Sequence, residues 1–146
     1  MRMVLVATLA IGCAGQRAAS HPASAHDATM FVFDHACGDP RTAAALVLPD
    51  DRVAGIAREG SHDRNGYSPA TLVAQICESL VHGNSELRIV GAVDVGPAGA
   101  DQGIRDGVVA DRVHFVMQDD SGKRSEFSHD VVCVQTGDGW RLAWIE

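Results

Sequence analysis

The sequence predicts an α+β fold, in which helices pack on a curved four-stranded antiparallel sheet. The first half of the chain carries capped segments with apolar residues at helical spacing, and the second half alternates in the manner of strands. The strongest local signal is the terminal hairpin, where a Thr-Gly-Asp-Gly turn joins the β-rich runs 131–135 and 140–145. With 146 residues, the chain has room for one domain with a hydrophobic core. We place that domain at residues 26–146.

Three short helices are predicted before residue 60. Asp27–Cys37 opens with a capping residue and spaces Met30, Phe33 and Cys37 as a helix does, although its Met-Phe-Val-Phe core also fits a short strand. Pro40–Leu48 begins with proline at a helix-opening position. Asp50–Arg58 is a third short helix, and the polar residues 59–67 form a loop.

The clearest helix is Ser68–His82. Ser68 is a natural N-cap, Pro69 takes the first helical position, and Gly83 is suited to the C-cap. Its apolar residues form one stripe, which we expect to face the sheet: Leu72, Val73, Ile76, Cys77 and Leu80.

Four strands follow, joined as a meander by a Gly-rich loop and two tight turns. Their predicted ranges are Leu87–Val95, Gly107–Gln118, Lys123–Gln135 and Trp140–Glu146. Alternation puts Val113, Phe115 and Met117 on one face of the second strand, with His114 and Val116 on the other. On the fourth strand it puts Trp140, Leu142 and Trp144 on one face.

The charge of the chain argues against nucleic acid as a partner. Its formal net charge is −7, and its arginines are interspersed with acids, as where Asp50 and Asp51 precede Arg52. Binding to a phosphate backbone needs a basic face.

Residues 1–25 have the pattern of an export signal and tether. A short apolar run follows Arg2, and Ala10-Ile11-Gly12-Cys13 resembles a bacterial lipobox, in which Cys13 is lipidated. Ala23-Ser24-Ala25 is an alternative site for ordinary secretory cleavage. We expect an exported protein held at the cell membrane by lipid on Cys13, with secretion as the alternative.

The remaining cysteines are Cys37, Cys77 and Cys133. An oxidising compartment favours one disulfide and one spare thiol. We prefer a Cys37–Cys77 bond between two helices; a Cys77–Cys133 bond and three buried thiols are the alternatives. No Cys/His spacing supports a metal site, and we expect no cofactor.

The order of helices and strands, together with the ending Gly-Asp-Gly-Trp-Arg-Leu-Ala, resembles the nuclear transport factor 2-like superfamily. This resemblance implies a cone-shaped α+β domain, related to polyketide-cyclase-like and ketosteroid-isomerase-like proteins. One departure is that residues 50–67 lack the strand pair that the family often has there.

The resemblance also implies where a site would lie. Enzymes of the superfamily place acids, histidines and a tyrosine inside the cone, so the catalytic candidates are Asp94, His114 and Asp130. His114 and His129 could also face each other across neighbouring strands. Tyr67, Phe115, Trp140 and Trp144 are the candidates for lining a cavity.

These patterns predict a non-catalytic exported domain that binds a small apolar ligand or an envelope partner protein. A ketosteroid-isomerase- or dehydratase-like enzyme is the first alternative, and an accessory subunit of a cell-envelope complex is the second. The sheet also offers a face for a homodimer.

Overall fold

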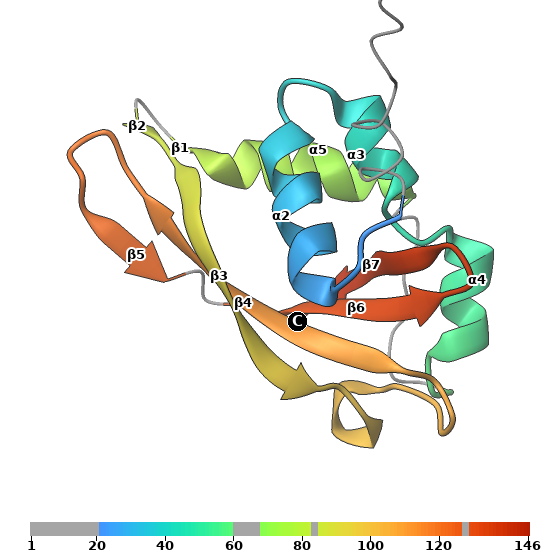
Figure 1. Cartoon of the computed structure of the whole chain (residues 1–146). Coiled ribbons are helices and arrows are strands. Elements are labelled where there is room, and N and C mark those ends of the chain that lie inside the picture. The colour runs from blue at the N-terminus through green and yellow to red at the C-terminus, as the bar shows by residue number, and fades with distance from the viewer. Residues whose placement is uncertain (1–20, 60–67, 83–84, 127–128) are drawn as a thin grey trace, which may run out of the picture.

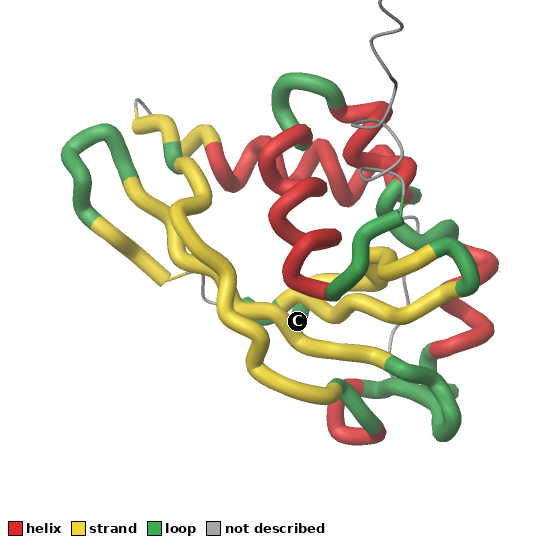
Figure 2. The backbone as a smooth tube through the Cα atoms, viewed as in Figure 1, coloured by secondary structure: helices red, strands yellow, loops and turns green. Residues whose placement is uncertain are grey.

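The computed structural model describes residues 21–59, 68–82, 85–126 and 129–146. It confirms the predicted α+β class: helices pack on a curved, open antiparallel sheet. Figure 1 shows α2, α3 and α5 together on one side of the sheet, with α4 beside β6 and β7. Figure 2 shows the long, curved path of the strands below these helices.

The helices begin where the sequence provides caps. The hydroxyl of Ser24 accepts the amide of Asp27 to start α2 (Ala25–His35), and Asp39 caps α3 (Pro40–Ala45) in the same way through Thr42. Helix α4 (Asp50–Ile56) follows Pro49, and Ser68 caps α5 (Pro69–Leu80). Helix α2 therefore begins at Ala25, two residues before its predicted start at Asp27, and Ser24 is its N-cap.

Helix α5 ends earlier than predicted. Its C-cap is Val81, and Val81–His82 form a short strand, β1, that pairs with β2 (Ser85–Glu86). The prediction of His82 in the last helical turn was therefore wrong. The β-branched Val81 favours the extended backbone that starts this small hairpin.

The main sheet follows the predicted order along the chain. Its strands are β3 (Arg88–Pro97), β4 (Ala110–Gln118), β6 (Val131–Thr136) and β7 (Gly139–Ile145), with β5 (Arg124–Glu126) beside β4. All pairs within it are antiparallel. The predicted third strand, Lys123–Gln135, is therefore two strands along the same edge of β4.

The loop between β3 and β4 is held against α4. It contains the short helix η1 (Ala100–Gln102), and Ile104 forms an antiparallel bridge with Ala57. The guanidinium of Arg105 donates to the carbonyl of Ala57 at 2.6 Å, which fixes the far end of the same loop.

Two hydrophobic clusters lie on opposite faces of the sheet. The first packs α2, α3 and α5 against β4, β6 and β7, and includes Val32, Phe33, Ile76, Phe115 and Leu142. The second packs Leu48, α4 and Ile104 against Val132, Val134 and Trp144. The sheet is thus covered on both sides at its β6–β7 end.

The disulfide joins α5 to Cys37, which lies two residues after the end of α2. Cys37 and Cys77 are bonded, with their Cα atoms 5.0 Å apart, so the structure contains the pair that the sequence favoured. The alternative bond to Cys133 is ruled out, because Cys133 is a free thiol buried in the first cluster.

Candidate functional site

The interior between helices and sheet is filled by side chains. Phe115 has no exposed surface, Phe33 is 3% exposed, and their ring centroids lie 4.2 Å apart. Among the residues that the structure describes, Thr29 is the one polar side chain counted as fully buried. The concave side of the sheet therefore contains packed core where the resemblance implied a cavity with acidic groups.

The four predicted cavity residues do not line one space. Phe115 and Trp140 pack in the first cluster, whereas Trp144 packs in the second. Tyr67 lies outside the described residues. The prediction that Trp140 and Trp144 share a face of the strand was wrong.

A β-bulge separates the two tryptophans. Val132 pairs with Trp144 but Cys133 pairs with Leu142, so Ala143 is an extra residue on β7. One inserted residue reverses the face of every side chain beyond it. Trp144 consequently turns away from Trp140 and Leu142 to pack beside Val132.

Two of the three catalytic candidates come together on the outer face. Nδ1 of His114 lies 3.0 Å from a carboxylate oxygen of Asp130, and the other oxygen lies 3.5 Å from the guanidinium of Arg112. Asp94 pairs through its backbone with Val113, whereas Val93 is the partner of His114. His114 thus meets Asp130, and His129 is exposed.

The interruption of the predicted third strand explains this contact. Val116 pairs with Glu126 and Val113 pairs with Val131, so the two halves differ by two residues in register. The interruption leaves Asp130 just before β6, beside His114.

We define the open sheet face as Val93, Arg112, His114, Val116 and Asp130. Val93 is 58% exposed, and the side chains of Arg112, His114 and Asp130 are each between a fifth and a third exposed. The open sheet face lies on the same side of the sheet as the second cluster. It borders the part of that cluster that contains Ala110 and Val132. Gly91 pairs with Val116 on the neighbouring strand and has no side chain that could cover Val116.

Cys133 is unsuited to nucleophilic catalysis. Burial raises the pKa of its thiol to about 12, although a hydrogen-bonding contact with the hydroxyl of Thr29 acts in the opposite direction. A nucleophilic cysteine needs a lowered pKa and access to a substrate.

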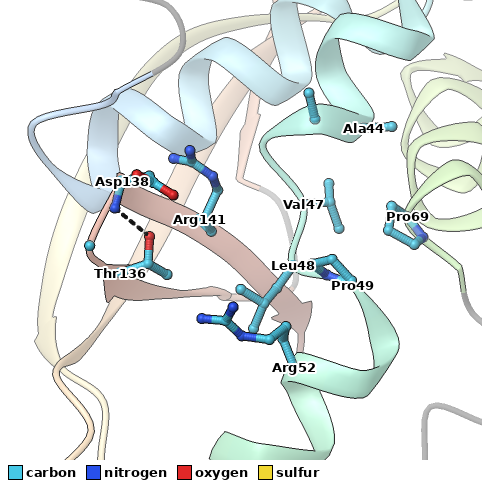
Figure 3. A pocket seen from close by; sticks show the side chains of 11 residues that line it. Ala44, Val47, Leu48, Pro49, Arg52, Pro69, Thr136, Asp138 and Arg141 are labelled. Carbon is cyan, nitrogen blue, oxygen red and sulfur yellow. Dashed lines mark hydrogen bonds between the residues drawn. The ribbon is translucent and has the colours of Figure 1, made fainter.

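A pocket of about 340 Å³ lies beside the outer edge of β7 (Figure 3). The α3–α4 connection forms one wall, where Leu48 donates its amide to the carbonyl of Leu142 at 2.7 Å. The β6–β7 turn forms the opposite wall. The lining residues are Ala44, Ala45, Val47, Leu48, Pro49, Arg52, Pro69, Thr136, Gly137, Asp138 and Arg141.

No pattern in the sequence predicts this pocket. Arg52 follows two acidic residues in the chain, and Arg141 belongs to the terminal hairpin. The pocket forms because residues 46–48 return along β7 and bridge to Leu142. That contact has no local sequence signal.

Within the described ranges, no group of three or more His, Cys, Asp or Glu side chains is arranged to hold a metal ion. No helix found there is long and apolar enough to cross a bilayer. Comparisons with protein-family models, curated proteins and solved structures found no match for this chain.

Proposed function

We propose that this chain is an exported, lipid-anchored domain that acts by binding a partner protein of the cell envelope. The observation that carries the proposal is the contrast between the two sides of the sheet. The concave side is filled by the first cluster, whereas the open sheet face exposes Val93 beside a polar group. An apolar patch with a polar rim is the arrangement of a protein-binding surface, and the patch here consists of Val93 and Val116.

The N-terminal contacts favour lipid attachment at Cys13 over cleavage after Ala25. Ser24 caps α2, the carbonyl of Pro22 accepts the amide of Trp140 at 3.1 Å, and Nδ1 of His21 lies 3.0 Å from the carbonyl of Asp138. Cleavage after Ala25 would remove all three contacts. Modification at Cys13 leaves them intact and leaves a short tether before them.

The disulfide adds support for export. A bond between Cys37 and Cys77 is stable in an oxidising compartment, where it closes a sequence separation of 40 residues. Reducing conditions in a cytosol disfavour such a bond.

The enzymatic alternative has less support from the geometry. An isomerase-like mechanism needs an acid or base enclosed with its substrate. The His114–Asp130 pair lies on the outer face, and the carboxylate of Asp130 also faces Arg112. An ion pair of this kind is common as a structural element of a sheet surface.

The variant Val93→Asp tests the proposed surface. A charge at this position should weaken partner binding roughly tenfold or more, because it must be desolvated at an apolar contact. Val109→Asp is the matched control, since Val109 is 56% exposed but lies before β4, outside the open sheet face. The measurement is the size of the detergent-solubilised complex in native electrophoresis.

We expect Val93→Asp to release the domain from its complex while Val109→Asp leaves it bound. Thermal unfolding of both variants checks that they are folded. A folded Val93→Asp variant that stays in the complex would contradict the proposal.

A further inference from the structure

The pocket beside β7 is lined by apolar and charged residues that have no part in partner binding through the open sheet face. Val47, Leu48 and Pro49 supply apolar wall, and Arg52 and Arg141 are also among the lining residues. Its lining carries two positive charges and one negative charge, whereas the whole chain has a net charge of −7. A locally positive pocket in an acidic protein is selective for anions.

Arg141 is the more fixed of the two arginines. It pairs with Val134 on the sheet, and its Nη1 donates to the carbonyl of Trp140 at 2.9 Å. Partial burial lowers the pKa of its guanidinium, and the nearby Asp138 acts in the opposite direction. The side chain stays charged, and because it is partly desolvated it gains more from an anion than a fully solvated group would.

Arg52, on α4, lines the pocket, whereas the acidic residues next to it in the chain do not. Asp50 and Asp51 precede it in the chain, but only Arg52 is among the lining residues. Its guanidinium has no ion-pair partner in the described part of the chain, and the residue is exposed. It is therefore available to a ligand.

The turn opposite Arg52 is already fixed. The hydroxyl of Thr136 donates to the carbonyl of Gly139 at 2.7 Å and accepts the amide of Asp138 at 3.3 Å. A Cβ at Gly139 would lie 2.8 Å from the carbonyl oxygen of Pro22, so the N-terminal segment packs directly on this turn. A fixed wall costs little ordering entropy when a ligand binds.

We propose that this pocket binds a small carboxylic acid with a short apolar chain. The carboxylate lies at Arg52, the chain packs on Val47, Leu48 and Pro49, and the nearby Arg141 adds to the positive potential of the pocket. Arginine suits this role because its planar fork matches a carboxylate. A volume of about 340 Å³ is near the lower end of the range for ligand pockets, about 300–1,000 Å³, and so favours a small molecule.

An NMR titration of the protein, purified as the cell processes it, tests the proposal with hexanoate as the probe. We expect millimolar binding, with shifts concentrated in the amides of residues 47–52 and 136–141. Hexanamide is the matched neutral probe and should bind roughly tenfold more weakly, because charged hydrogen bonds supply much of the affinity. Inorganic phosphate, which lacks an apolar chain, should also bind more weakly than hexanoate.

Arg52→Gln should weaken hexanoate binding roughly tenfold. Arg58→Gln is the control, since Arg58 is an exposed arginine close by that faces Asp106 and does not line the pocket. The exposure of Arg52 makes this variant safe for folding, so the test does not depend on Arg141→Gln. Two results of the titration with the wild type would overturn the proposal: hexanamide or phosphate binding as tightly as hexanoate, and no shifts at residues 47–52 and 136–141. Equal effects of the two variants on hexanoate binding would overturn it as well.

Discussion

Burial determines the chemistry of Cys133. Its sulfur lies 3.4 Å from the hydroxyl of Thr29 and 3.7 Å from the carbonyl of Ala25, inside the first cluster. The thiolate has no solvent there, so desolvation raises the pKa to about 12. In the unfolded chain the same thiol titrates near its ordinary pKa of about 8.5.

This difference predicts a loss of stability at alkaline pH. The folded protein holds a proton that the unfolded chain releases, so the stabilisation is complete below about pH 8.5 and decreases as the pH rises toward 12. Relative to Cys133→Ala, the free energy of unfolding of the wild type should fall by about 1.4 kcal/mol per pH unit above about pH 9. Urea titrations of both proteins at several pH values measure it. A difference that is independent of pH would contradict the burial of this thiol.

His114 and Asp130 show what residue patterns can and cannot predict. Both were candidates from the sequence, and alternation correctly placed His114 and Phe115 on opposite faces of the strand. Their contact depends on a register shift of two residues between β5 and β6. Pairing register is a property of two strands together, so it could not be derived from either strand alone.

At the scale of elements, caps and turns were the most informative signals. Ser68, Pro69 and the Gly-Asp-Gly turn each mark a local backbone geometry, and the structure has α5 and the β6–β7 hairpin there. The end of α5 and the bulge at Ala143 could not be predicted in this way. Both depend on tertiary packing: β1 pairs with β2, and Trp144 packs in the second cluster.

The link between α2 and α5 gives a prediction at the same scale. The Cys37–Cys77 bond closes a long loop, so removing it should increase the entropy of the unfolded chain. Cys37→Ala with Cys77→Ala should lower the free energy of unfolding by about 2–4 kcal/mol. Urea denaturation measures the change, and reduction of the wild type should reproduce it. A loss below about 1 kcal/mol would show that the bond does not constrain the fold.

At the scale of the whole molecule, the two sides of the sheet differ in how much of their surface is covered by helices and loops. One side is covered by α2, α3 and α5, while on the other side the residues that the structure describes cover the sheet toward β6 and β7 (Figure 1). The class of fold was predictable because periodicity and turns determine it. The distribution of open and covered surface was not, since it depends on how residues 46–58 pack across the far face.

This distribution places the proposed partner and the proposed ligand at different parts of the surface. The open sheet face lies on β3 and β4, and the pocket lies beside β7, with β6 between β4 and β7 in the sheet. Each can therefore be altered without touching the other. A variant at Val93 leaves the pocket lining intact, and a variant at Arg52 leaves the open sheet face intact.

The most direct test of the proposed function is photo-crosslinking in cells, with a photoreactive amino acid in place of Val93. Gln75, an exposed residue on α5, is the control position because it belongs to the helical side of the molecule. We predict one adduct with an envelope protein from position 93, none from position 75, and loss of the adduct when Cys13→Ala removes the anchor. Equal adducts from both positions, no adduct from position 93, or an adduct only with a second copy of this chain would contradict the proposed function.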